Sequence, residues 1–352
     1  MATTYRVGVI GCGGMGGVHT DSWTNNSRTE VVALADVSRE AAQNLAEKYS
    51  VPAIYTDYRE LLEKEELDIV SVPTWQGIRG EITIAAARSG VKAIIGEKPL
   101  EAAMGPANDM IAVCDENDVK LVIGHHKRFS PQLTEMRRLV ADGAVGQPLM
   151  VYHIAKPNAG LLNTATHAID TWRYTLSDPG TLWVIGQTKR TTDRWERRSA
   201  CEDLCMGLVC FEGGCRGVYE GDLPDPRIHM PDITGSEGKI KGGPEGVVLL
   251  QQDGEAGWRE IDPPPVETNQ FDELLDWMEG KVPGHRSTGH QARYTLEIML
   301  AIFESLRIKD VVKLPLETRE SPLDMMIADG SLPVLEEGRY DLRAPFPEEQ
   351  TG

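Results

Sequence analysis

Three glycines near the start of the chain have the spacing of a phosphate-binding turn. Gly11, Gly13 and Gly16 follow a short apolar run and form a G-x-G-x-x-G pattern. Glycine permits a tight turn at the first position, close approach of a pyrophosphate at the second, and close packing of a helix on the sheet at the third. The N–H groups at the start of that helix attract phosphate. The predicted cofactor-binding residues of this turn are Gly11, Cys12, Gly13, Gly14, Met15 and Gly16.

A carboxylate stands where the ribose of such a dinucleotide is bound. Residues 30–35 have the apolar pattern of a buried strand, and Asp36 follows directly. A carboxylate at this place accepts hydrogen bonds from the ribose hydroxyls and repels a 2′-phosphate, so NAD is favoured over NADP. Arg39 lies close by and is either a residue that softens this preference or a solvated residue of the next helix.

Polar segments follow three further strand-like runs. Pro73, Thr74 and Trp75 come after residues 69–72, Glu97, Lys98 and Pro99 after 93–96, and His125 and His126 after 120–124. Because ligands of open parallel sheets bind beyond the carboxyl ends of the strands, all these segments are expected around one crevice. By residue type alone, a lysine between a glutamate and a proline is usually an ordinary surface charge. The prediction for Lys98 therefore depends on its place directly after a strand.

The elements that must position these residues indicate two domains. Residues 1–124 alternate strand-like and helix-like runs, which predicts a parallel sheet with helices on both faces. Residues 125–316 begin with helices at 132–142 and 166–176 around a strand at 149–155, and continue between 181 and 251 with short strands separated by turns, which predicts a large, mostly antiparallel sheet. Helices are expected at 271–279 and 291–306. Residues 317–352 are expected to be a tail that wraps the surface or contacts another subunit.

Composition excludes several classes of function. The chain has 352 residues, of which 41% are hydrophobic and 26% charged, values ordinary for a globular protein. A net charge of −18 argues against partners among nucleic acids and anionic membranes. No signal peptide or membrane span is evident, and the six cysteines form no C-x-x-C pair, so we expect a cytoplasmic protein with buried thiols and no metal.

Several motifs in order resemble one known family. They are the turn 11–16 with Asp36, Glu97-Lys98-Pro99, GHHKRFSP at 124–131, GLLNTATHAID at 160–170, and two glycine turns at 211–214 and 235–238. Together they resemble the glucose–fructose oxidoreductase, inositol dehydrogenase and rhizopine catabolism (Gfo/Idh/MocA) group, over residues 5 to 316.

The resemblance implies a Rossmann domain, a second α/β domain with an open sheet that often forms oligomers, and hence a homo-oligomer, either a dimer or a tetramer. It also implies hydride transfer between a nicotinamide and a secondary hydroxyl of a sugar, sugar derivative or cyclitol. Lys98 would hold the reacting oxygen and lower its pKa. His167 would take the proton, a task suited to an imidazole at neutral pH. Glu97 would orient backbone or ribose groups.

Other polar residues are expected to line the substrate pocket. The candidates are His126, which also contacts the nicotinamide, together with Arg128, His153, Lys156 and Asn163. Asn163 departs from the family pattern, which has an aspartate four residues before the histidine. An amide can bind a substrate hydroxyl through its carbonyl or its nitrogen, but supplies no charge to stabilise a protonated His167. We therefore expect that Asn163→Asp raises the apparent pKa of the pH–rate profile. Ala165 also replaces a glycine, and Arg79 stands near the place of a family histidine.

Two other functions remain open from the sequence. The same scaffold can cleave glycosides without net redox change, through transient oxidation and elimination, in which case reduced cofactor does not accumulate. A non-catalytic NAD-binding regulator is the third possibility, and the presence of Lys98 and His167 argues against it.

Overall fold

The structure, a computed structural model, describes residues 4–154, 160–221 and 230–343. The chain forms two compact units. The first comprises the chain up to Glu101 together with Pro106–Gly124 and Thr268–Ala292, and the second comprises Ala102–Gly105, His125–Glu267 and the remainder from Arg293. Apart from the short segment Ala102–Gly105, the chain passes from the first unit to the second after Gly124, and the segment 268–292 returns to the first unit, although the sequence pattern placed it in the second.

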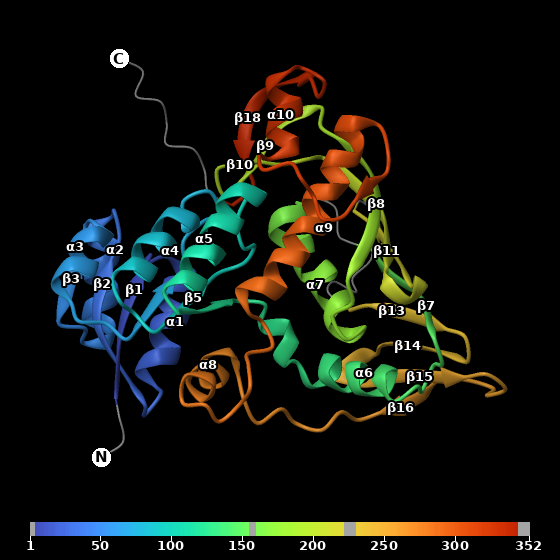
Figure 1. Cartoon of the computed structure of the whole chain (residues 1–352), viewed down its shortest axis with the longest axis horizontal. Coiled ribbons are helices and arrows are strands. Elements are labelled where there is room, and N and C mark those ends of the chain that lie inside the picture. The colour runs from blue at the N-terminus through green and yellow to red at the C-terminus, as the bar shows by residue number, and fades with distance from the viewer. Residues whose placement is uncertain (1–3, 155–159, 222–229, 344–352) are drawn as a thin grey trace. The chain divides into compact units, whose positions relative to one another are not determined.

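The first unit contains a six-stranded parallel sheet, in the order β3-β2-β1-β4-β5-β6, which is the Rossmann order (Figure 1). This confirms the predicted fold of the N-terminal region. Its elements are β1 (Tyr5–Ile10), α1 (Gly14–Thr24), β2 (Thr29–Ala35), α2 (Arg39–Tyr49), β3 (Ala53–Tyr55), α3 (Tyr58–Lys64), β4 (Ile69–Val72), α4 (Arg79–Arg88), β5 (Ala93–Gly96), α5 (Met104–Glu116), β6 (Lys120–Ile123) and α8 (Gln270–Met278).

The central strands of this sheet form the core of the unit. Val9, Leu34, Ile69 and Ile95 are fully buried, as expected for parallel strands covered by helices on both faces. β3 and α3 were not expected from the sequence, because three half-buried residues and seven helical ones give too short a periodic pattern to recognise.

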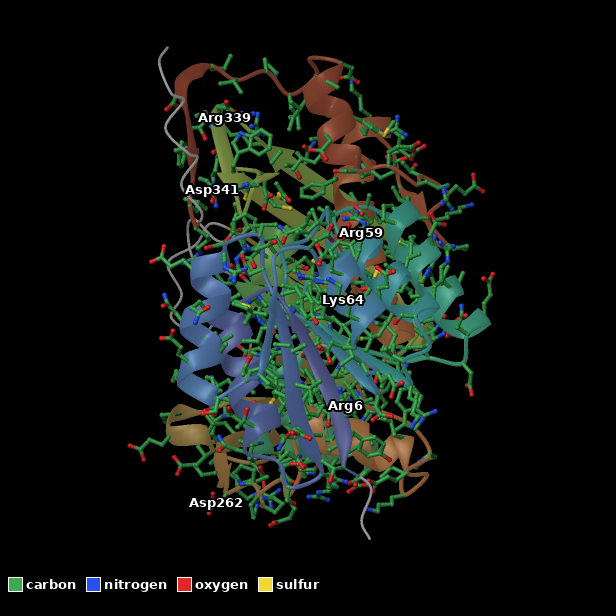
Figure 2. All side chains as sticks on the ribbon, turned by 90° about the vertical axis from the view of Figure 1, so that its left-hand side faces the viewer. Arg6, Arg59, Lys64, Asp262, Arg339 and Asp341 are labelled. Carbon is green, nitrogen blue, oxygen red and sulfur yellow. The ribbon has the colours of Figure 1, made fainter. Side chains whose placement is uncertain are left out.

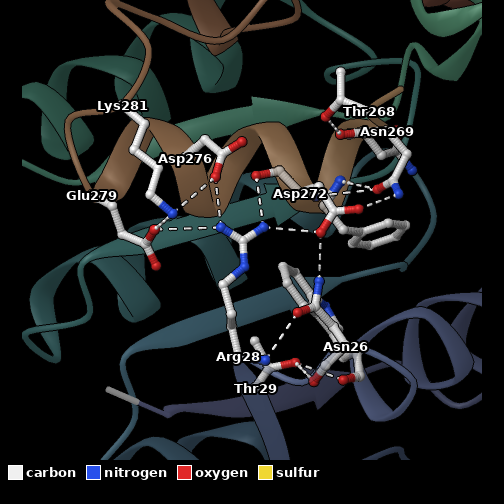
Figure 3. A network of polar contacts seen from close by, with 12 residues as sticks. Asn26, Arg28, Thr29, Thr268, Asn269, Asp272, Asp276, Glu279 and Lys281 are labelled. Carbon is white, nitrogen blue, oxygen red and sulfur yellow. Dashed lines mark hydrogen bonds and ion pairs between the residues drawn. The ribbon is translucent and has the colours of Figure 1, made fainter. Parts of the chain in front are cut away.

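A polar network holds α8 against the first unit (Figure 3). The Arg28 guanidinium donates to Asp276 Oδ1 at 2.6 Å and to Asp272 Oδ1 at 2.9 Å, and Asn26 Nδ2 donates to the same Asp272 oxygen at 2.8 Å. Phe271 packs edge-on against Trp23, with ring centroids 4.9 Å apart. These contacts explain why a segment so late in the chain folds with the N-terminal sheet.

In the described residues, the second unit is built on a nine-stranded sheet, in the order β16-β15-β14-β13-β7-β12-β11-β8-β17, in which only β7 and β12 pair in parallel. The predicted open, mostly antiparallel sheet is therefore confirmed. Its strands are β7 (Pro148–Ile154), β8 (Thr181–Lys189), β11 (Leu204–Phe211), β12 (Arg216–Glu220), β13 (Asp232–Gly235), β14 (Gly238–Gly242), β15 (Val248–Gln252), β16 (Arg259–Ile261) and β17 (Val312–Lys313).

Three helices, α6 (Pro131–Ala141), α7 (Thr166–Thr175) and α9 (Gly289–Ile308), lie on one face of this sheet (Figure 1). The packing of α7 and α9 is close enough to require glycine in the strands beneath. A Cβ on Gly217 would lie 2.6 Å from the Trp172 ring, and one on Gly207 would lie 2.6 Å from Ile302 Cδ1. The turns η1 (His126–Phe129), η3 (Glu212–Gly214) and η4 (Pro244–Gly246) and the π-helical turn η2 (Leu161–Ala165) complete the connections.

The C-terminal segment joins a second small sheet. After α10 (Pro322–Ala328), β18 (Glu336–Asp341) pairs in parallel with β9 (Thr192–Glu196), which also pairs with β10 (Ser199–Ala200). Figure 2 labels Arg339 and Asp341 on β18. Arg339 lies 3.4 Å from Asp193, and Asp341 accepts hydrogen bonds from the N–H groups of Arg197 and Arg198 at 3.0 and 2.7 Å. The described part of the tail is thus integral to the second unit.

All six cysteines are buried free thiols, as the sequence indicated. Among the described residues, no helix combines the length and apolar character needed to span a bilayer, and no group of three or more His, Cys, Asp or Glu side chains is arranged to hold a metal ion.

Candidate functional site

The glycine turn between β1 and α1 has an open cradle. Gly11 has a φ of +108°, which only glycine adopts readily, and a Cβ on Gly16 would lie 2.0 Å from the Gly11 carbonyl oxygen. By contrast, a Cβ on Gly13 or Gly14 would meet no atom within 4 Å. No side chain caps the N-terminus of α1. The backbone of this turn therefore fits a pyrophosphate, with N–H groups and the positive end of the helix dipole directed at it.

Asp36 stands directly beside this turn. Its Oδ2 accepts a hydrogen bond from the Cys12 N–H at 2.7 Å, and its Oδ1 accepts one from the Ser38 N–H at 2.8 Å. Burial, and secondarily the Asp36 charge, raise the pKa of the Cys12 thiol to about 12, so this cysteine packs and does not ionise. Arg39, the first residue of α2, is exposed.

A buried hydrogen-bond chain positions Glu97, which follows β5. Glu97 Oε1 lies 3.3 Å from His19 Nε2, and His19 Nδ1 lies 2.7 Å from Ser71 Oγ, to which Trp23 Nε1 also donates at 3.1 Å. Because a carboxylate only accepts, the chain is satisfied when His19 carries its proton on Nε2 and the Ser71 hydroxyl donates to Nδ1. Burial alone would raise the pKa of Glu97, but the hydrogen bond from His19, together with the positive charges of Lys98 and Arg79, outweighs it and lowers that pKa.

The backbone N–H of Lys98 donates to Glu97 Oε2 at 3.2 Å, so the same carboxylate holds the main chain at Lys98. The Lys98 side chain is half-buried, and the Lys98–Pro99 peptide bond is cis.

Arg79 joins the loop after β4 to the loop after β5. Its guanidinium, 1% exposed, donates to the carbonyl oxygens of Pro99, Leu100 and Thr74. In parallel, both carboxylate oxygens of Glu101 accept from the Gly77 N–H, at 3.0 and 2.9 Å. The segments containing Pro73-Thr74-Trp75 and Glu97-Lys98-Pro99 are therefore bound to each other, and Pro73 and Thr74 also lie against Gly11.

In the second unit, histidines gather where β6 leads into η1 and where η2 leads into α7. The ring of His167 lies edge-on to that of His126, with centroids 5.2 Å apart, and 6.4 Å from that of His125. His125 Nε2 lies 3.2 Å from Thr166 Oγ1. His126 is exposed, whereas His125 and His167 are buried. The structure thus brings together two of the predicted site residues, His126 and His167.

Arg128 is engaged in a buried ion pair. Its Nε and Nη2 donate to Asp170 at 2.9 and 2.8 Å, and Nη2 also lies 2.8 Å from Asp178. Burial works against the Asp170 carboxylate, but the charge of Arg128 prevails and lowers the pKa of Asp170. These contacts anchor η1 to α7, and a substrate contact of Arg128 stays a prediction.

The remaining predicted residues have different surroundings. Asn163, in η2, is buried and donates from Nδ2 to Glu196 Oε1 at 2.5 Å. His153, on β7, is buried and stacks on Tyr219, with centroids 6.4 Å apart. Lys156 lies outside the described residues.

Sequence reasoning missed the groups that support these residues, namely His19, Ser71, Glu101, Glu196 and Glu202. Glu202 is buried, and its Oε1 accepts a hydrogen bond from the N–H of Leu161, the first residue of η2, at 2.6 Å. Each of these groups acts on a partner far away in the chain, and the local pattern around each contains no signal for it.

Comparisons with known proteins agree with this geometry. Residues 5–125 match the model of the Gfo/Idh/MocA oxidoreductase family, described as having an NAD-binding Rossmann fold. D-apiose dehydrogenase of Paraburkholderia graminis is 23% identical over 67% of this chain and 67% of its own length. Myo-inositol 2-dehydrogenase of Thermotoga maritima is 25% identical over 72% of this chain and 80% of its own.

Among solved structures, a levoglucosan dehydrogenase in complex with NADH and levoglucosan is 20% identical, with a TM-score of 0.73 over 89% of this chain and all of that one, a likeness that establishes the fold. The family model covers the Rossmann sheet, and the relatives extend the similarity into the second unit. With the open glycine cradle, the carboxylate at the end of β2 and the ordered motifs, these matches support a Gfo/Idh/MocA oxidoreductase, the family whose model matches residues 5–125.

Proposed function

We propose that the protein is an NAD-dependent dehydrogenase that acts on a secondary hydroxyl of a sugar, sugar derivative or cyclitol. The open cradle at Gly13 and Gly14, at an uncapped helix N-terminus, is the observation that carries the cofactor assignment. Relatives named as dehydrogenases of D-apiose and myo-inositol support the substrate class. Bound nicotinamide would supply the hydride chemistry.

Asp36 supports the choice of NAD. Two backbone N–H groups hold its carboxylate at the end of β2, beside the glycine turn. A carboxylate fixed in this way accepts hydrogen bonds from ribose hydroxyls and repels a 2′-phosphate. Arg39 is exposed nearby. An arginine can accommodate the 2′-phosphate of NADP, but here the Asp36 carboxylate remains in place and repels that phosphate. We expect Asp36→Ser to lower the ratio of kcat/KM for NAD to that for NADP.

Lys98 and His167 are proposed as the catalytic pair. Lys98 would hold the reacting oxygen and lower its pKa, while Glu97 holds the Lys98 main chain. His167 would accept the hydroxyl proton, since an imidazole has a pKa suited to general-base catalysis at neutral pH. The nearby His126 ring would help to orient the substrate or the nicotinamide.

The test is turnover with NAD or NADP on a panel of sugars, anhydro sugars, inositols and glycosides, followed by the absorbance of reduced nicotinamide. Accumulation of reduced cofactor supports the dehydrogenase. Aglycone release without reduced cofactor would replace it with redox-neutral glycoside cleavage, and tight NAD binding without turnover on any class would favour a regulator.

Variants then test the catalytic pair. Lys98→Met and His167→Asn are each expected to lower kcat by roughly 10²- to 10⁴-fold. Lys92→Met and His290→Asn are matched controls, because Lys92 pairs with Asp68 before β5 begins and His290 pairs with Asp115 on the surface. Full activity in either active-site variant would exclude that residue from the pair.

A further inference from the structure

The Asn163 side chain is oriented by a buried carboxylate. Nδ2 of Asn163 lies 2.5 Å from Oε1 of Glu196, and the two residues are 4% and 2% exposed. An ionised carboxylate can only accept hydrogen bonds, so the amide nitrogen must face it. The carbonyl oxygen Oδ1, which can only accept, is consequently turned away from Glu196.

Glu196 is itself held firmly. It is the last residue of β9, and its Oε1 also lies 3.3 Å from Arg343 Nε, which follows β18. On its other side, a Cβ at Gly160 would lie 2.5 Å from Glu196 Oε2 and 2.5 Å from Cys201 Sγ. The carboxylate therefore lies against the backbone at the start of η2, where a Cβ on residue 160 would displace the Glu196 or Cys201 side chain.

The Glu196 contact occurs at an irregular turn. η2 is a π-helical turn, in which Thr164 and Ala165 both donate to the Gly160 carbonyl oxygen, at 2.9 and 3.2 Å. Such turns are rare and recur at functional sites. A second buried carboxylate, Glu202, binds the N–H at its first residue. A carboxylate at the end of β9 and another in the connection from β10 to β11 thus fix the Asn163 side chain and the backbone of η2.

We infer that Glu196 is a positioning residue for the active site, which orients Asn163 so that its carbonyl oxygen is the atom offered to a substrate hydroxyl. The inference rests on the proposed function together with the sequence-based prediction that Asn163 binds the substrate. It resolves the choice between carbonyl and amide that the sequence left open. It also changes the expectation for Asn163→Asp, because that variant would place two carboxylates at hydrogen-bonding distance, where like charges repel.

A double-mutant cycle at neutral pH tests the pair without any need for turnover. Asn163→Asp is expected to lower the urea midpoint of unfolding, and the double variant Asn163→Asp/Glu196→Gln to regain most of it, since a glutamine at 196 removes the repulsion. Glu304→Gln, a buried carboxylate paired with Arg307 on α9, is the matched control and should not rescue. Additive effects of the two substitutions would show that Asn163 and Glu196 do not interact, and would overturn the inference.

The activity arm separates positioning from mere stability. Glu196→Gln retains an acceptor for Asn163 and should keep kcat/KM within a few-fold of the parent, whereas Glu196→Leu should lose roughly tenfold or more, chiefly through KM. Equal activity of the glutamine and leucine variants would overturn the positioning role. Coupling in the stability cycle with an inactive parent would instead refute the proposed function and leave the pair supported.

Discussion

At the scale of single residues, the partners of a buried carboxylate decide the direction in which its pKa is shifted. Glu97 and Glu202 are both buried, yet their environments act in opposite directions. His19 donates to Glu97 and lowers its pKa in spite of burial. For Glu202, burial outweighs the hydrogen bonds to its carboxylate and raises the pKa to about 7. One carboxyl is therefore maintained as an anion, and the other is protonated over part of the neutral range.

Glu202 makes folding stability depend on pH. Because its pKa is about 7 in the folded protein and about 4.5 in the unfolded chain, the folded state binds the proton more tightly. Its stabilising contribution is complete below the unfolded value and is lost as the pH rises through the folded value, by up to about 3 kcal/mol. Glu202→Gln should flatten the decline of unfolding free energy between these pH values in urea titrations. An unchanged slope would show that another group titrates there.

At the scale of elements, the loops after β1, β4 and β5 depend on tight backbone contacts. The helix α1 approaches β1 at Gly16, and Arg79 at the start of α4 bridges the loops that contain Thr74 and Pro99. The elements hold the site in shape through packing and through hydrogen bonds to backbone carbonyl groups.

Two adjacent glycines of α1 give opposite predictions. Gly16→Ala would place a Cβ 2.0 Å from the Gly11 carbonyl oxygen, so it should cost about 1–3 kcal/mol of stability and weaken NAD binding. Gly17→Ala meets only Leu45 Cδ1 at 3.8 Å and should stabilise the helix by about 0.5–1 kcal/mol. Thermal unfolding and NAD titration measure both effects, and equal behaviour of the two variants would contradict the close approach of α1.

Replacement of Arg79 should disturb the loops more than the fold. Arg79→Lys retains the charge but cannot donate to three separate carbonyl oxygens from one planar fork, so kcat should fall roughly tenfold while the far-ultraviolet circular dichroism stays the same. Arg59, labelled on α3 in Figure 2, is exposed and pairs with Asp57 and Glu81, so Arg59→Lys serves as the control. If Arg79→Lys kept the kcat of the parent protein, the loops after β4 and β5 would not need the guanidinium of Arg79 to keep their conformation.

At the scale of the whole molecule, the chain is divided between two units that each use distant segments. The first unit recruits α8, and the second recruits β18 from the C-terminal segment. The net charge of the whole chain is −18. An anionic substrate would therefore need local cations, and uncharged sugars or cyclitols meet no such barrier.

The Arg28 network should contribute measurably to the stability of the first unit. Arg28 is only partly exposed and reaches two aspartates of α8 (Figure 3), so Arg28→Met should cost about 1–3 kcal/mol in chemical denaturation. Arg6, labelled in Figure 2, is more exposed and lies 3.3 Å from a single carboxylate, Glu65, so Arg6→Met should cost less than about 1 kcal/mol. Similar losses in both variants would mean that the network adds nothing to ordinary surface pairs.

The sequence by itself determined the fold class and the cofactor turn, whereas the candidate catalytic residues came from the family resemblance. These features are local, because the glycine spacing, the carboxylate after β2 and the apolar runs of parallel strands each lie within a few consecutive residues. The antiparallel sheet was predictable for the same reason, from its short strands and turn residues. β3, α3, the π-helical turn and the strand β18 were too short or too irregular to recognise.

Only the tertiary structure decided which groups support the candidate site. His19 and Glu97 are 78 residues apart, Asn163 and Glu196 are 33 apart, and Asn26 and Asp272 are 246 apart. No periodicity in one sequence links such partners, because the sheet topology and the packing of helices bring them together. The orientation of the Asn163 amide is decided in the same way, by a carboxylate on another sheet that can only accept its hydrogen bond.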